Sequence, residues 1–141
     1  MPLPDTIKAF IKSAWEDGYP LIVATAGPDG PVMGPKGSMV VYDDNHLAYW
    51  ERTRGRILDA VRADPRVCIL YANMPAQRAG KIESGFLRFF GTAELHESGP
   101  VYDKIFSLIS PREQTHAGAD TGIGVLVRIT QAADIRGKPL M

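Results

Sequence analysis

The chain has 141 residues, enough for one domain with a substantial core but too few for a second. Its formal net charge at pH 7 is +0, which gives no overall attraction to nucleic acid or to a membrane surface. A single cysteine excludes a disulfide within the chain, and no apolar run approaches the ~20 residues that a membrane span needs. The first residues lack the basic and apolar regions of a signal peptide, so we expect a cytoplasmic protein.

The beginning of the chain predicts a helix followed by a hairpin. Asp5 can cap a helix whose apolar residues recur at helical spacing, and Gly18 and Pro20 end it. Two strands, over residues 21–26 and 32–42, flank a Pro-Asp-Gly turn in which proline presets φ and glycine accepts a positive φ.

The middle of the chain predicts two further strands around a second helix. The strands cover residues 46–50 and 66–72, and the helix ends before an Asp-Pro pair at residue 64. The second of these strands is apolar on both faces, so it is expected to be central, with Cys68 packed inertly in the core. Residues 74–85 contain a proline, two glycines and mixed charge, which indicates a mobile loop.

The last third of the chain predicts two strands and a helix. Residues 86–96 alternate, with Leu87 and Phe89 on one face, and residues 123–129 form the final strand. Pro100 opens a helix, and residues 111–122 form a second polar loop. Six strands with few links long enough for parallel crossovers, and about three peripheral helices, predict a mainly β (α+β) antiparallel barrel, a single domain over residues 1–141.

Large apolar residues on the strand at 86–96 exceed what one small barrel needs inside. The four in question are Phe86, Leu87, Phe89 and Phe90. An apolar surface shared between two copies of the chain would explain them.

Arginines gather where the strand at 46–50 meets the second helix. The run is Glu51, Arg52, Thr53, Arg54, Gly55 and Arg56. A helix start supplies unpaired N–H groups and a positive dipole end, and guanidinium groups add charge-assisted hydrogen bonds, so the run suits a phosphate group. Cations are unfavourable at this end of a helix dipole, which also argues for a bound anion. The alternative is a solvated helix face in which Arg54 and Arg56 pair with Asp59.

The preceding strand offers apolar bulk and exposed backbone to a flat ring. Its candidate residues are Lys36, Gly37, Ser38, Met39 and Val40. Lys36 and the amides that follow could stabilise negative charge on a reduced flavin, and Gly37 could admit the ring closely. The alternative is that Lys36 and Gly37 only form a turn or bulge. A phosphorylated planar cofactor is therefore expected, and flavin mononucleotide (FMN) fits best.

Other kinds of site have little support in the sequence. His46, His96 and His116 do not show metal-ligand spacing, and no Gly-x-Ser-x-Gly nucleophile motif occurs. Tyr42, Tyr49 and Trp50 could stack on a flavin, or pack in the core or between copies. No catalytic residue is assigned.

Several weak motifs in a consistent order resemble the FMN-binding split-barrel family, typified by pyridoxamine 5′-phosphate oxidase. They are Gly30-Pro31-Val32 through Val41, Arg52 to Arg56, Asp64-Pro65-Arg66-Val67, Gly85 to Glu94, and Gly99-Pro100-Val101-Tyr102. The likeness covers most of the chain and is strongest to the small FMN-binding proteins of that superfamily.

The resemblance implies a homodimer with FMN in a groove between the subunits. It places the phosphate at Thr53, Arg54 and Arg56, the flavin ring along residues 36–40, and Trp50 and Glu51 near the ribityl chain. A partner loop would complete the pocket, with Arg78 and Lys81 as candidates.

The chain departs from the oxidase itself in two respects. It ends at Leu140-Met141 without a basic C-terminal segment, and it has Lys36-Gly37 where the oxidase has an arginine-rich run. Vitamin B6 oxidation is therefore not expected. The leading hypothesis is an FMN-dependent oxidoreductase with a small-molecule redox substrate or electron donor. The alternatives are a non-enzymatic FMN carrier, or a deazaflavin or haem protein on the same barrel, haem requiring an axial histidine such as His116.

Overall fold

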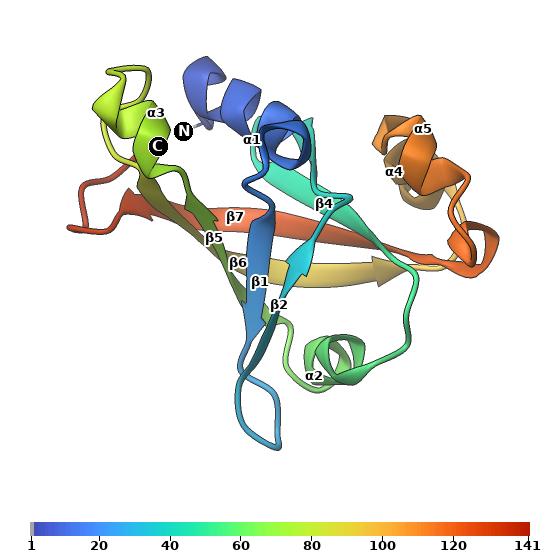
Figure 1. Ribbon diagram of the computed structural model, residues 1–141. Coiled ribbons are helices and arrows are strands. Elements are labelled where there is room, and N and C mark those ends of the chain that lie inside the picture. Colours follow the sequence, from blue (N-terminus) through green and yellow to red (C-terminus); the bar gives the residue numbers. More distant parts are fainter. Residues whose placement is uncertain (1) are drawn as a thin grey trace.

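The computed structural model describes residues 2–141, which form one curled sheet with helices around it (Figure 1). The strands are β1 (Leu21–Thr25), β2 (Val32–Lys36), β3 (Val40–Asp43), β4 (His46–Glu51), β5 (Arg66–Ala72), β6 (Phe86–His96) and β7 (Ile123–Asp134). The helices are α1 (Asp5–Asp17), α2 (Arg56–Ala63), α3 (Met74–Arg78), α4 (Pro100–Leu108), α5 (Pro111–Gln114) and the 3₁₀ helix η1 (Ala119–Thr121). The mainly β, antiparallel class is confirmed, with one strand and several short helices more than predicted.

The sheet curls because its two edges are consecutive in the sequence. The strand order is β2-β1-β5-β6-β7-β4-β3, and all the pairings are antiparallel. Only residues 37–39 separate the edge strands β2 and β3, so the Cα atoms of Lys36 and Val40 lie at most about 15 Å apart. The edges therefore approach each other at this corner, and the barrel stays split between them.

The single strand predicted over residues 32–42 is wrong, because the chain breaks at Gly37 and Ser38. The Ser38 hydroxyl accepts a hydrogen bond from the Trp50 N–H (2.9 Å) and donates one to the Trp50 carbonyl (3.2 Å). This side chain pairs with the β4 backbone where a sheet ladder would otherwise run. Lys36 thus ends β2 and Gly37 begins a turn, which leaves their part in cofactor binding a prediction.

Other boundaries also differ from the prediction. The presumed loops at 74–85 and 111–122 contain α3, α5 and η1, and β7 continues to Asp134. Helices α3 and α5 begin with the side chains of Asn73 and Ser110, which accept backbone N–H bonds, each followed by a proline in the first turn. Helix α1 begins one residue earlier than expected, with Pro4 at the N-cap and Asp5 in the first turn, where its charge suits the helix dipole.

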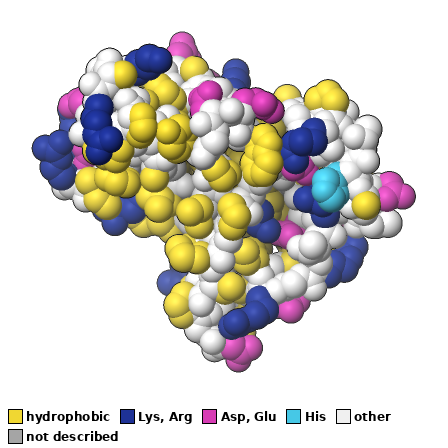
Figure 2. Space-filling model, in the orientation of Figure 1, with side chains coloured by type: hydrophobic (Ala, Val, Ile, Leu, Met, Phe, Trp, Pro, Cys, Tyr) yellow, Lys and Arg dark blue, Asp and Glu magenta, His cyan; other side chains and the backbone are white. Residues whose placement is uncertain are grey.

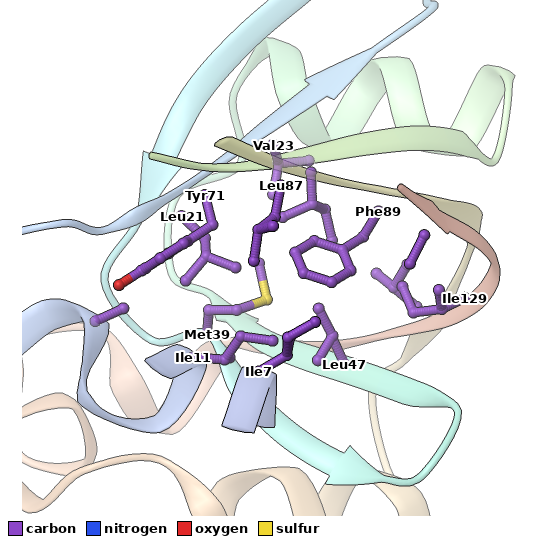
Figure 3. Packing of buried hydrophobic residues seen from close by; sticks show 14 of the residues in the cluster. Ile7, Ile11, Leu21, Val23, Met39, Leu47, Tyr71, Leu87, Phe89 and Ile129 are labelled. Carbon is purple, nitrogen blue, oxygen red and sulfur yellow. The ribbon is translucent and has the colours of Figure 1, made fainter. Parts of the chain in front are cut away.

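The main core fills the inside of the curled sheet (Figure 3). Ile7 and Ile11 of α1 close one side, and Leu87 and Phe89 point inward from β6, as the alternation predicted. Met39, next to the break between β2 and β3, also points into this core. Leu87 and Phe89 therefore do not belong to a surface shared between copies.

A second, smaller cluster lies on the outer face of β4 and β7. Ile105 of helix α4 and Ile109, the residue after the helix, pack against Ala48, Trp50 and Leu126. This packing fixes the end of β4, from which the arginine-rich run departs.

The outer face of β1, β5 and β6 is mostly apolar, with Arg88 among its side chains, and it is only partly covered. Its side chains include Ile22, Leu70, Phe86 and Phe90, all half-buried, and on the neighbouring β2 Met33 is 62% exposed. Figure 2 shows hydrophobic side chains gathered over this part of the molecule. Of the four residues predicted to be in excess, Phe86 and Phe90 thus remain available to a partner. No helix within residues 2–141 is both long and apolar enough to cross a membrane.

Candidate functional site

Most of the predicted cofactor residues line one cavity of about 140 Å³ at the split in the barrel. These residues are Lys36, Gly37, Ser38, Trp50, Glu51, Arg52 and Thr53, and Pro35 and Glu113 complete the lining. The cavity forms because the Ser38–Trp50 hydrogen bonds hold the corner after β2 against the end of β4. Two segments that the sequence proposed separately thus meet in one site.

One wall of the cavity is a buried ion pair. The Lys36 ammonium lies 2.7 Å from Glu51 Oε2, and the two side chains are only 13% and 4% exposed. The Thr53 hydroxyl donates to the other Glu51 oxygen at 3.2 Å. Lys36 also lies 5.3 Å from the centre of the Tyr49 ring, and burial, with the charge of Glu51, raises the pKa of Tyr49. The Tyr49 phenol therefore stays neutral, and its ring belongs to the core.

The same cavity is also lined by a second ion pair, which involves a residue that the sequence analysis missed. Arg52 Nε lies 3.4 Å from the buried carboxylate of Glu113, which also pairs with Arg112 at 3.0 Å. Arg52 is further hydrogen-bonded to the ring of His116. The pattern Ser110-x-x-Glu113 could have revealed the start of α5. Nothing in the local sequence indicates that the Glu113 carboxylate reaches Arg52, which lies far earlier in the chain.

The Trp50 indole is committed to the protein rather than to a ligand. Its ring packs against Tyr102 and Phe106 of α4 with centroid distances of 4.7 and 5.2 Å. Its Nε1 donates a 2.7 Å hydrogen bond to the Ala119 carbonyl. Of the three interpretations left open for this aromatic (flavin stacking, core packing and packing between copies), core packing is the one that the structure shows.

The three arginines of the run contact three different elements. Arg52 reaches α5, whereas Arg54 donates to the Thr121 carbonyl at 3.2 Å and approaches Glu97 at 3.8 Å. Arg56 is exposed and lines a separate cavity of about 80 Å³ against the β1–β2 turn. The structure thus does not gather the three guanidinium groups around one point.

The start of α2 nevertheless retains its anion-binding character. Gly55 is the N-cap and offers no side-chain acceptor, so the first-turn N–H groups lack a cap. Arg56 is the first residue of this helix, and Asp59 lines the same cavity without forming an ion pair with it in the described chain. A phosphate here would meet Arg56 and the helix N–H groups, with Asp59 opposing it.

The remaining candidates lie elsewhere. Met39 is a core residue, and Val40 packs against the α4 cluster; both line a cavity of about 180 Å³ on the other side of the Lys36–Ser38 segment. Gly37 makes room for Trp15, because a Cβ on it would lie 2.8 Å from the indole. Lys81 lines a cavity of about 660 Å³ beside the N-terminal part of α1 and the C-terminal tail, away from the predicted cofactor residues.

Two further features concern reactive groups. Burial raises the pKa of the Cys68 thiol, which lies half-buried on the outer face of β5. Within residues 2–141, no three His, Cys, Asp or Glu side chains gather in a way that could hold a metal ion.

The sequence profile described as pyridoxamine 5′-phosphate oxidase matches residues 3–128 of this chain. No curated protein matches the sequence of this chain. Among solved structures, HupZ from Group A Streptococcus is 21% identical with a TM-score of 0.69, over 94% of this chain and 97% of that one. A pyridoxamine 5′-phosphate oxidase candidate from Lactobacillus delbrueckii is 24% identical with a TM-score of 0.67, over 93% of both chains. An FMN-binding protein from Syntrophomonas wolfei is 8% identical with a TM-score of 0.62, over 92% of this chain and 86% of that one. These likenesses concern the fold.

Proposed function

Because the chain belongs to the pyridoxamine 5′-phosphate oxidase family, we propose that it is a flavoprotein that binds FMN between two copies of itself and uses it for oxidoreduction. The similar fold of an FMN-binding protein supports a flavin as the cofactor. Its partners would be a small-molecule redox substrate and an electron donor.

The observation that carries the proposal is the junction of β2, β4 and α2. A polar cavity lined by Lys36, Glu51 and Arg52 suits the polar edge of a flavin ring, which both donates and accepts hydrogen bonds. The uncapped start of α2 with Arg56 suits the phosphate. Only two residues separate Thr53, on the cavity, from Arg56, so one elongated cofactor can reach both places.

The residues present divide the tasks of holding such a cofactor. When bound, FMN would supply the hydride and electron chemistry. Lys36, Thr53 and Arg52 would orient its ring, and Arg56 would fix its phosphate. None of these side chains is a free acid or base poised toward a substrate, because the carboxylates of the cavity are held in ion pairs. This favours a reaction in which the protein only positions the cofactor, and it keeps an FMN carrier as the second candidate.

A second copy of the chain would complete the site. Small-molecule pockets usually measure about 300–1,000 Å³, whereas the cavity in one chain holds about 140 Å³. The bare apolar face of β1, β5 and β6 offers the surface for self-association. We expect Phe90→Glu to produce monomers in analytical ultracentrifugation, while Thr92→Glu, on an exposed position of the same strand, leaves the dimer intact. Equal effects of both variants, or a monomeric parent protein, would contradict the dimer.

The first test of the proposal is the visible spectrum of the purified protein. Flavin absorption bands, and release of FMN identified by mass spectrometry after denaturation, are the expected result. Release of a deazaflavin or haem would overturn the choice of FMN. Haem has little support here, because His116 is engaged by Arg52. A colourless protein that leaves the fluorescence of added FMN and riboflavin unquenched would overturn flavin binding altogether.

A further inference from the structure

Lys36 is not the free cation that the sequence suggested, because Glu51 neutralises it inside the cavity. The pair is short, at 2.7 Å, and Glu51 is almost fully buried, so its charge is not shared with solvent. The nearest second partner of the carboxylate is the uncharged Thr53 hydroxyl. The pair therefore enters any ligand site as a neutral unit with a dipole, not as a positive charge.

The rest of the cavity lining also carries paired charges, because two arginines share the carboxylate of Glu113. Arg52 lies 3.4 Å from Glu113, and Arg112 lies 3.0 Å from the same carboxylate. The Arg112 side chain is 41% exposed, lies over the Trp15 ring and donates to the Gly37 carbonyl, so solvent partly screens the charge that it adds. A buried ion pair is a poor source of stability compared with apolar packing, so its presence beside a cavity indicates a role in the site.

We infer that Glu51 sets the redox potential of the bound flavin by cancelling the charge of Lys36; this inference rests on the proposed flavin site. Reduction by two electrons with uptake of one proton leaves one negative charge on the flavin ring. An uncompensated cation beside the ring binds that reduced form more tightly than the oxidised form and raises the potential. The Lys36–Glu51 pair removes this preference, so the reduced cofactor is held no more tightly than the oxidised one and gives up its electrons readily.

The test is a reductive titration of the flavin-loaded protein with dithionite, against a reference dye of known potential. In Glu51→Gln the amide keeps the hydrogen bond to Lys36 but loses the charge. The preference for reduced over oxidised flavin should then grow by at least about tenfold, which is about 30 mV for a two-electron couple. The double variant Lys36→Met with Glu51→Gln should return to the potential of the parent protein, because neither charge remains.

A matched control is available at the other end of the molecule. Lys138 and Glu83 form an ion pair at 2.6 Å, but their side chains are 60% and 80% exposed. Glu83→Gln should leave the potential unchanged. If Glu51→Gln binds flavin and its potential shifts no more than that of Glu83→Gln, or if the double variant keeps the raised potential, the inference is wrong. Failure of every variant and of the parent to bind flavin would instead overturn the proposed function.

Discussion

Replacing Arg56 with alanine separates the phosphate end of the candidate site from the ring end. Arg56 is the first residue of α2, and no side chain at the N-cap accepts hydrogen bonds from the backbone N–H groups of the first turn. Arg56 does not line the cavity formed by Lys36 and Glu51, so its removal should leave the ring end unchanged. FMN carries the phosphate and riboflavin lacks it, so the two ligands report on the two ends independently.

The expected magnitude follows from the kind of bond that is lost. A hydrogen bond between a charged donor and a charged acceptor contributes about 1.5–3 kcal/mol, so the Kd for FMN should rise by about ten- to 150-fold. Arg56 is exposed, and solvent screens its charge, so the lower part of this range applies. Asp59 lines the same cavity, and its negative charge repels a phosphate, so Asp59→Asn should lower the Kd for FMN, whereas Arg56→Ala should raise it.

Fluorescence quenching titrations with FMN and with riboflavin measure both effects. The matched control is Arg62→Ala, which removes the same charge from the last turn of the same helix, where Arg62 lies 3.7 Å from Glu97. Only Arg56→Ala should lose affinity for FMN, and neither variant should lose affinity for riboflavin. Equal losses for the two ligands, or an unchanged Kd for FMN, would refute the placement of the phosphate at α2.

Three further predictions concern the fold. Gly91→Ala would place a Cβ 2.2 Å from a backbone carbonyl oxygen of β7, so it should lower the free energy of unfolding, measured by urea denaturation, by about 1–3 kcal/mol or more. In the control Gly34→Ala the new Cβ meets only a side-chain methyl at 3.1 Å, so the free energy of unfolding should stay within about 1 kcal/mol of the parent. Hydrogen bonds from Arg66 lower the pKa of Asp64 to about 2, so the ionised carboxylate stabilises the fold above about pH 4 and this contribution is lost as the pH falls toward 2. Between about pH 4 and pH 2 the free energy of unfolding should therefore fall less in Asp64→Asn than in the parent protein. Burial raises the pKa of Cys68, so iodoacetamide should alkylate Cys68 more slowly than it alkylates free cysteine. The rate should increase when the protein is diluted until the two copies separate. Alkylation at the rate of free cysteine would contradict the placement of Cys68.

The strands were predictable where local alternation and burial agree. β6 covers the predicted residues, because its alternating side chains face a core on one side only. The break between β2 and β3 was foreseen only as the alternative of a turn at Lys36 and Gly37, although Gly34, Pro35 and Gly37 are unusual in a strand. The cause lies in Ser38, whose hydroxyl finds its partners on Trp50, a tertiary contact that no local pattern contains.

The same distinction applies to the candidate site. The segments at 36–38 and 50–53 were recognisable by composition, and the fold does bring them together. Glu113 was not recognisable, because its segment resembles an ordinary polar loop and its partner Arg52 lies far away in the sequence. The arginine run was over-interpreted as one cluster, because neighbours along an irregular segment need not point in the same direction. Arg52, Arg54 and Arg56 are each drawn to different acceptors or cavities.

This divergence changes how charge is distributed over the site. If all three guanidinium groups faced one point, a single strongly positive pocket would hold the phosphate and also stabilise a reduced ring. The structure instead pairs Lys36 with Glu51 and Arg52 with Glu113, so both cations that line the cavity are paired, and it places Arg56 in a separate cavity at the helix start. A cofactor with one anionic end and one neutral, polar ring matches this division in only one orientation. Affinity can then come from the phosphate end, while the neutral end leaves the ring free to change charge during a redox cycle.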